Sequence, residues 1–229
     1  MAQIRRIFLN GGEIAAVSGA GAGGDPAAQL ESIVADCLTL LAEEGLSRED
    51  IALTRLWMSD RDSAAKLNDV RDRLLRGALR SASSSFFSRQ RMRDGGAVSV
   101  EFYAARPQSG ASRRIVEFDP PRRYAHYLAT GDWLFLSGMA EEGETMDLQF
   151  DRAFAQVEAA LEAEGFTWSE AACVNLFLQR GTATAGWFLD RFRKAAPALP
   201  PVLTFETVDE LANTPKHLEI ELIARRRRP

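Results

Sequence analysis

The chain has few of the residue types that most often bind metals through nitrogen and sulfur. Among 229 residues there are two histidines and two cysteines, and none of them share a metal-ligand spacing. We therefore expect no metal site and no cofactor. Cys37 falls in a helical pattern and Cys173 in a strand pattern, at positions that do not correspond. This indicates two buried thiols in a reducing compartment rather than a disulfide.

Long apolar runs and an excess of positive charge are also absent. No segment approaches the roughly 20 apolar residues of a membrane-spanning helix. Residues 1–13 include arginines but have neither a long apolar run nor a small-residue cleavage site, so they do not resemble a signal peptide. The formal net charge of −4 disfavours nonspecific binding to nucleic acid, which depends on a basic surface. We expect a cytoplasmic protein without a membrane partner.

The chain contains the same sequence pattern twice, once in each half. The recurring positions mark strand ends, a helix start and a helix end, with offsets of 118 to 120 residues: Ser18 and Ser137, Gln29 and Gln149, Gly45 and Gly165, Leu56 and Leu176, Glu101 and Glu219. This period is far longer than that of solenoid repeats and indicates a duplicated domain. We predict a first domain over residues 1–107, a linker and first strand of the second domain over 108–119, and a second domain over 120–229.

Each repeat predicts the element order ββαβαββ. Asn10 and Gly11 are typical of a tight hairpin turn, and Asp25 followed by Pro26 is typical of a helix start. The expected strands are residues 3–9, 13–18, 51–58, 97–104, 115–118, 133–137, 171–178, 202–208 and 217–224, and the expected helices are one from 26 to just before 45, then 62–75, 147–164 and 185–195. This order predicts an α+β fold of two mixed sheets, each with two helices on one face. The open face of each sheet must be covered by the other half or by another chain.

Several segments of the second half occur together in a known family. They are Tyr124-Ala-His, Leu134-Phe-Leu-Ser137-Gly138, Gln149, Gly165, Leu176-Phe-Leu178 and Leu218-Glu219-Ile220-Glu221-Leu-Ile-Ala224. Residues 120–226 resemble the reactive-intermediate deaminase family (Rid, also called YjgF), and residues 3–105 resemble it more weakly. The tandem also resembles, more loosely, the longer chorismatase group, which uses a C-terminal glutamate as an acid.

The resemblance implies domains with a chorismate-mutase-like fold and small-molecule sites in clefts between subunits. It also implies hydrolysis of reactive imines and enamines without metal or cofactor. Family members form trimers, so we expect a homo-oligomer, either a trimer of two-domain chains or a pseudo-symmetric assembly.

The resemblance further implies a pocket whose residues match this sequence one by one. Its tyrosine, serine and water-orienting glutamate match Tyr124, Ser137 and Glu219, which we predict to be catalytic. Its asparagine is absent from the second half but matches Asn68 in the first. Because Asn68 and Tyr124 each occur in one half only, we expect one composite site between the halves.

The family arginine that binds the substrate carboxylate is missing from its position in both halves. In the second half that position falls at Leu203, and in the first half the segment 80–93 is longer and differently composed. Either its arginines and serines form an anion pocket in place of the lost arginine, or the segment is a solvated, mobile loop. The residues that we predict to bind substrate are Asn68, Ser18, Glu101, Arg89 and Arg91.

The chemistry of the pocket depends on Glu219. Its strand neighbours Leu218 and Ile220 are apolar, so a carboxylate in a partly dry cleft would have a raised pKa and act as a general acid or base. The alternative is a carboxylate that points to solvent from an alternating strand. Tyr124 likewise either lies at the cleft or is a packed tyrosine with a satisfied hydroxyl. With only two histidines in the chain, a Ser/His/Asp triad is disfavoured.

Two further motifs are weighed against function. The glycines of residues 19–24 satisfy G-x-G-x-x-G, but the helix starts after the third glycine. The next strand ends at Asp60, 36 residues past Gly24, whereas the ribose-binding acid is expected after about 20, so we predict no nucleotide site. The arginine run 225–228 is interpreted as a solvated tail. The alternative is that it covers an acidic partner surface or reaches an anion in a neighbouring cleft.

The functional prediction is a metal-free hydrolase or lyase, deaminase-like, for a small anionic metabolite in an inter-domain or inter-subunit cleft. The alternative is a non-catalytic protein that binds a small molecule or stabilises a complex. A ribonuclease activity is disfavoured by the acidic charge.

Overall fold

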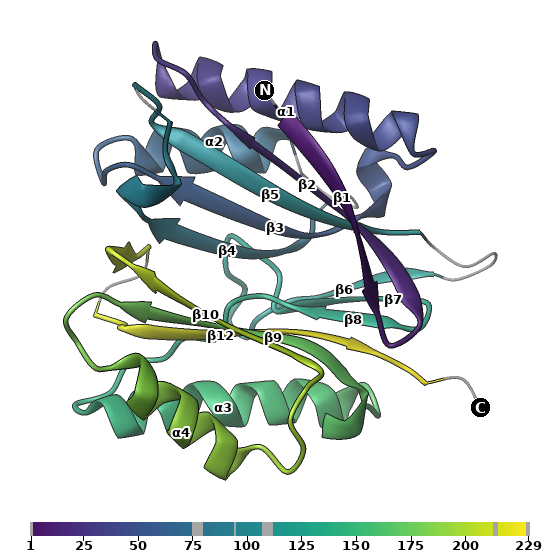
Figure 1. Ribbon diagram of the computed structural model, residues 1–229, viewed down its shortest axis with the longest axis vertical. Coiled ribbons are helices and arrows are strands. Elements are labelled where there is room, and N and C mark those ends of the chain that lie inside the picture. Colours follow the sequence, from purple (N-terminus) through teal and green to yellow (C-terminus); the bar gives the residue numbers. More distant parts are fainter. Residues whose placement is uncertain (1, 75–79, 94, 107–111, 213–214, 228–229) are drawn as a thin grey trace.

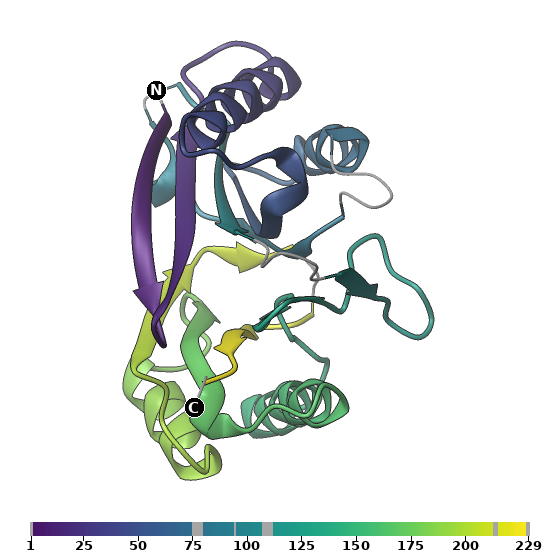
Figure 2. The ribbon, with the colours of Figure 1, turned by 90° about the vertical axis from the view of Figure 1, so that its right-hand side faces the viewer.

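The computed structural model describes residues 2–74, 80–93, 95–106, 112–212 and 215–227. Two mixed sheets face each other, and each carries two helices on its outer face (Figures 1 and 2). The predicted α+β fold class, with both helices of each half on one face of its sheet, is confirmed.

The two halves are built from corresponding elements. The first half contains β1 (Ala2–Leu9), β2 (Gly12–Ala20), α1 (Pro26–Glu43), β3 (Ile51–Met58), α2 (Ala64–Leu74), β4 (Ala82–Phe87) and β5 (Val98–Ala105). The second half contains β6 (Arg113–Val116), β7 (Tyr127–Thr130), β8 (Trp133–Leu136), α3 (Met146–Ala163), β9 (Ala171–Gln179), α4 (Ala185–Ala195), β10 (Val202–Val208), β11 (Glu210–Leu211) and β12 (Leu218–Arg225). Short 3-10 turns lie at Arg48–Asp50, Arg89–Arg91 and Trp168–Glu170.

The strand order shows the internal symmetry directly. The first sheet runs β1-β2-β5-β3-β4-β11 and the second β10-β9-β12-β8-β7-β6. When the second order is read from its other end, β7-β8-β12-β9-β10 corresponds to β1-β2-β5-β3-β4. In both halves the strand after the second helix is parallel to the strand before that helix. The duplication read from the sequence is therefore a duplication of topology.

The turn residues and the helix-start residues identified in the sequence adopt the expected local structure. Asn10 and Gly11 have φ angles of 45° and 74°, the left-handed conformations that the tight β1–β2 turn needs. The Asp25 carboxylate accepts a hydrogen bond from the backbone N–H of Ala28 at 3.1 Å, and Pro26 begins α1.

One segment differs from its simplest interpretation. Within residues 80–93, the solvated-loop alternative is wrong for β4, whose residues are almost all buried. A strand rich in serine can be buried because the serine hydroxyl groups have hydrogen-bond partners. Ser84 Oγ donates to Glu221 of the facing sheet at 2.9 Å.

The start of the second domain also differs from expectation. A strand was predicted at 115–118, and β6 lies close by at Arg113–Val116, but the hairpin partner of β8 is β7, which was not predicted. β7 is only four residues long and is separated from β8 by a turn at Gly131, so it gives little periodic signal.

The two domains also exchange a strand. β11 follows β10 in the second half but pairs antiparallel with β4 at the edge of the first sheet, with Glu210 opposite Phe87. The first sheet is thus completed by a segment of the second domain.

Of the described C-terminal arginines, Arg225 is partly buried, whereas Arg226 and Arg227 are exposed, as expected for a solvated segment. The guanidinium of Arg225 lies 5.3 Å from the ring centroid of Trp133 and donates to the backbone carbonyl of Asn10. Arg226 donates to the carbonyl of Gly165 at 3.1 Å. Arg228 lies outside the described residues. In Figure 2 the β1–β2 hairpin extends alongside the second half, which brings Asn10 to Arg225.

The space between the sheets is filled mainly by apolar side chains from both halves. Trp57 and Phe86 of the first sheet pack against Phe177 of the second, with ring centroids 4.2 to 6.0 Å apart. Burial of this kind drives association of the sheets. The halves therefore cover each other's open faces within one chain, and the predicted trimer stays a prediction.

Candidate functional site

The edge of β4 is where the two halves exchange polar contacts. The backbone N–H of Ser83 donates to Ser137 Oγ at 2.8 Å, and the backbone N–H of Gly138 approaches the Ser83 carbonyl at 3.4 Å. The Ser137 hydroxyl in turn donates to the backbone carbonyl of Ala125 at 2.5 Å. Ser137 is fully buried and joins a loop of the second half to a strand of the first.

Glu219 lies directly beside this bridge. It is only 7% exposed, because β12 alternates and turns Glu219 and Glu221 toward the facing sheet while their apolar neighbours enter the core. A side chain at Gly138 would overlap the Glu219 carboxyl group, so the glycine after Ser137 is required by this close approach. The solvent-facing alternative for Glu219 is wrong.

The carboxyl group of Glu219 is held in an unusual state. Its Oε1 is buried and has no hydrogen-bond partner in the described part of the chain. Burial raises the pKa of Glu219 to about 8, and the nearby charge of Glu221 acts in the same direction. The nearby Ser84 hydroxyl group and the positive charges of Lys216 and Arg55 oppose this increase. The group is therefore largely protonated at neutral pH.

Arg71 faces the same strand edge from the first half. It lies on α2, is 8% exposed, and its Nη1 donates to Ser83 Oγ at 2.9 Å and to Ser85 Oγ at 2.7 Å. Burial lowers the pKa of Arg71 to about 10. The Asp72 carboxylate is 4.0 Å away, which is a weak ion pair. The guanidinium is thus a buried cation held mainly by hydroxyl groups.

The register of the strands shows what position Arg71 fills. Ser83 is paired with Thr54 as Leu203 is paired with Val174, and Thr54 and Val174 differ by the 120-residue period. Ser83 is therefore the first-half equivalent of Leu203, where the resemblance places the carboxylate-binding arginine. The strand arginine is missing, but the guanidinium of Arg71 reaches the same place from α2.

Asn68 and Tyr124 lie on the two sides of Arg71. Asn68 is one helical turn before it on α2, and its Oδ1 is buried without a partner in the described residues. Tyr124 is partly buried, packs edge-on against Phe118 with centroids 5.4 Å apart, and lies close enough to act electrostatically on Arg71.

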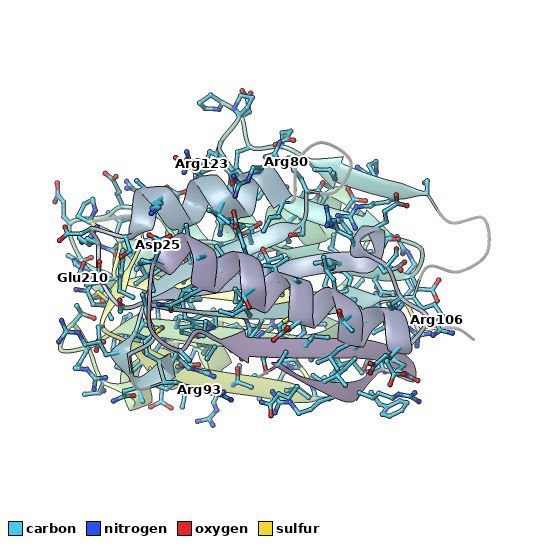
Figure 3. The ribbon with its side chains drawn as sticks, turned by 90° about the horizontal axis from the view of Figure 1, so that it is seen from above. Asp25, Arg80, Arg93, Arg106, Arg123 and Glu210 are labelled. Carbon is cyan, nitrogen blue, oxygen red and sulfur yellow. The ribbon has the colours of Figure 1, made fainter. Side chains whose placement is uncertain are left out.

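Two ion pairs attach the segment that carries Tyr124 to helix α2. Arg123 pairs with Asp69 at 2.8 Å and with Asp72 at 2.9 Å, and Figure 3 shows it beside α2. We use the term composite site for the residues that these contacts bring together, namely Asn68, Arg71, Ser83 and Ser85 of the first half and Tyr124, Ser137 and Glu219 of the second.

The other predicted residues lie elsewhere. Ser18, Glu101 and Arg91 line an open cavity of about 340 Å³ on the first sheet, which we call the first-half cavity. Arg89 is exposed, and its backbone N–H donates to Asp209 at 3.0 Å. The residues predicted to bind one substrate therefore divide between two places.

Sequence reasoning missed Arg71 because it looked for an arginine on the strand. The available signal was the spacing of three residues between Asn68 and Arg71, which puts both on one face of α2. The serines at 83 and 85 gave the complementary signal of a polar strand. Within the described residues, no three histidine, cysteine or acidic side chains gather as metal ligands would. No helix there is long and apolar enough to cross a membrane.

Fold and topology together define a tandem of two domains with the same strand topology. No family model matches the sequence, and no curated protein matches it. Among solved structures, a chorismatase superposes on 96% of this chain and 79% of its own, with a TM-score of 0.66 and 16% identity. The resemblance is thereby confirmed at the level of the fold.

Single-domain structures match half of the chain. A member of the YjgF/YER057c/UK114 family from Mycobacterium tuberculosis covers 50% of this chain with all of its own length, at 21% identity and a TM-score of 0.44. RidA from an Antarctic Psychrobacter covers 49% of this chain with 99% of its own, at 19% identity and a TM-score of 0.43.

Proposed function

We propose that this protein is a metal-free hydrolase or lyase that acts on a small anionic metabolite at the composite site. The observation that carries the proposal is the pairing of opposite chemical features across one strand edge. Glu219 of the second half provides a buried carboxyl group with an unpaired oxygen, and Arg71 of the first half provides a buried cation. Arg71 donates to Ser83, the backbone N–H of Ser83 donates to Ser137, and the next residue, Gly138, lies against the Glu219 carboxyl group.

Glu219 is suited to donate a proton. A carboxyl group with a pKa of about 8 is mostly protonated at neutral pH and is still acidic enough to transfer its proton. Protonation at the carbon of an enamine or enol ether gives an iminium or oxocarbenium ion, which then adds water. The carboxylate left on Glu219 takes a proton of that water and passes it to the nitrogen or oxygen that leaves. The C–N or C–O bond then breaks, and the hydroxyl proton returns to Glu219, which gives a ketone, the amine or alcohol, and the regenerated carboxyl group.

Arg71 is suited to hold the anionic group of the substrate. A guanidinium binds a carboxylate through parallel hydrogen bonds. A substrate anion, in addition to the weakly paired Asp72, would offset the free-energy cost of burying the Arg71 cation. Asn68 and Tyr124 flank it and orient the rest of the substrate through their polar ends. Ser137 uses its hydroxyl to hold the two halves in register and keeps a lone pair for a donor group of the substrate.

Two substrate groups follow from this chemistry. The similarly folded chorismatase acts, by its name, on chorismate, which has carboxylate groups and an enol ether. The Rid resemblance points to imines and enamines derived from amino acids. Both types combine an anionic group with a bond that acid catalysis opens, so both belong in the first assay.

The test is turnover of chorismate and of imines that an amino-acid oxidase generates in situ. Wild-type protein should convert at least one of them, with kcat falling as the pH rises through about 8, because the protonated Glu219 is required. Glu144→Gln, an exposed glutamate of the same half, should behave as wild type. If calorimetry shows that these compounds bind at the composite site but none is converted, the non-catalytic alternative replaces the proposal.

A further inference from the structure

The first-half cavity lies toward the β1–β2 edge of the first sheet, whereas the composite site lies at β4, near the other edge. It has a volume of about 340 Å³ and is walled by β1, β2, β5 and the segment after β4, with Gln3, Arg5, Ser18, Trp57, Arg93 and Ser99 among its lining residues. Figure 3 shows Arg93 on the side of the molecule opposite Arg123, which lies at the composite site. The two places are therefore separate.

The wall of this cavity is positively charged. Three arginines and one glutamate line it, which gives a formal charge of +2. The ion-pair partners of this wall are Arg55, which pairs with Glu101 and Glu221, and Glu206, which pairs with Arg91, so the wall and these partners together keep a formal charge of +1. A concave site with net positive charge attracts anions.

One of the lining residues carries a donor group without an acceptor. Trp57 lines the cavity and is 0% exposed, and its indole Nε1 has no acceptor in the described part of the chain. A buried N–H group without an acceptor costs free energy, so such a group indicates a missing partner. The Arg91 guanidinium lies 4.5 Å from the centroid of the Trp57 ring and adds positive charge above it.

The cavity nevertheless lacks the parts for chemistry. Glu101 is the counterpart of Glu219, but its carboxylate is already bound by the Arg55 guanidinium. The position of Tyr124 is taken by Arg5, as the sequence comparison indicates. We propose that the first-half cavity is a second binding site, which binds a small organic anion through a carboxylate or phosphate group without converting it.

The experiment follows the indole resonance of Trp57 by proton–nitrogen NMR during titration with pyruvate and, separately, with inorganic phosphate. Trp57→Phe assigns the resonance. We expect a saturable shift with at least one of the two anions, and the responding anion identifies the preferred group. No shift with either at millimolar concentration would overturn the proposal.

Two variants locate the binding. Arg5→Gln, on an exposed side chain, should weaken the affinity about tenfold, because a charge-assisted hydrogen bond is lost. Arg106→Gln, which lines a different pocket, is the matched control and should leave the affinity unchanged. If Arg5→Gln also leaves it unchanged, the proposal is wrong.

A third variant separates this proposal from the proposed function. Glu219→Gln should leave the Trp57 shift and its affinity intact, whatever it does to turnover. If Glu219→Gln abolishes the shift, the anion binds at the composite site and the second site does not exist. A protein without any turnover would still show the shift if the second site is present.

Discussion

The composite site and the first-half cavity contain the same pair of residues in different surroundings. Ser137 and Glu219 in one correspond to Ser18 and Glu101 in the other. Glu101 is bound by Arg55, whereas Glu219 has a buried oxygen without a partner among the described residues. After duplication, the strand position was kept and the neighbours changed. The comparison teaches that the chemistry of a carboxylate is set by what covers it.

The largest expected effect comes from neutralising each member of this pair in turn. Glu219→Gln should lower kcat about 10²- to 10⁴-fold at nearly constant volume, because the proton donor is lost. Glu101→Gln should lower it less than tenfold, since Glu101 lies outside the composite site. Steady-state kinetics on the substrate identified above checks both. Equal losses in the two variants would remove the distinction between the sites.

Arg55 pairs with Glu101, and this pairing distinguishes Glu101 from Glu219. Removing Arg55 tests the buried ion-pair network that it forms. It bonds Glu101 at 2.9 Å and also pairs with Glu221, which is fully buried. Arg55→Met should cost about 3–5 kcal/mol of unfolding free energy, because it leaves uncompensated buried carboxylates. Urea denaturation measures this loss.

Two companion variants make the Arg55 result specific. Arg61→Met breaks an exposed pair with Glu210 and should cost less than about 1 kcal/mol. The double variant Arg55→Met with Glu221→Gln should recover part of the loss. An Arg55→Met protein as stable as wild type would show that the network is not needed for folding.

Arg71 should affect substrate binding more than stability. Arg71→Leu should lower kcat/KM about 10- to 100-fold, mostly through KM, because a charged hydrogen bond to the substrate anion is lost. Arg73→Leu, on the exposed face of the same helix, is the control. Partial rescue by Arg71→Lys would agree with an anion-binding role. An unchanged KM in Arg71→Leu would place the substrate anion elsewhere.

The last effect, which is small for each pH unit, is the pH dependence of stability. The folded pKa of Glu219, about 8, lies above that of a free glutamate, so the folded state binds the proton more tightly than the unfolded state. Stability from this group is full below the unfolded pKa and falls as the pH rises toward 8. The unfolding free energy of wild type should fall relative to Glu219→Gln by at most about 1.4 kcal/mol per pH unit between those values. Urea titrations at pH 5 to 8 check the sign, and parallel curves would contradict it.

Much of the fold followed from local patterns. Strands β3 and β10 and helix α4 have the predicted bounds, because their apolar periods and flanking turn residues encode them directly. β7 was missed since four residues give little period, and the pairing of β11 with β4 was missed because it joins two domains. Long-range pairing leaves no periodic trace in the sequence.

The candidate site could be predicted from the sequence less completely than the fold. The residue types at Tyr124, Ser137, Glu219 and Asn68 were found from the sequence, and their roles stay predictions. Arg71 was not found, since its importance comes from the distance of its guanidinium to two serines on another element. Nor could the sequence separate Ser18 and Glu101 from the composite site, because the division depends on how the two sheets face each other.

The sequence by itself determined the duplication, the order of the elements and the residue types at the strand ends, because these depend on local periodicity and turn chemistry. Only the tertiary structure decided which half supplies each side of a site, which carboxylate is paired and which cation replaces the missing arginine. Those outcomes depend on desolvation and on distances between residues far apart in the chain. Arg55 and Glu221, 166 positions apart, form their ion pair only when the two sheets pack together.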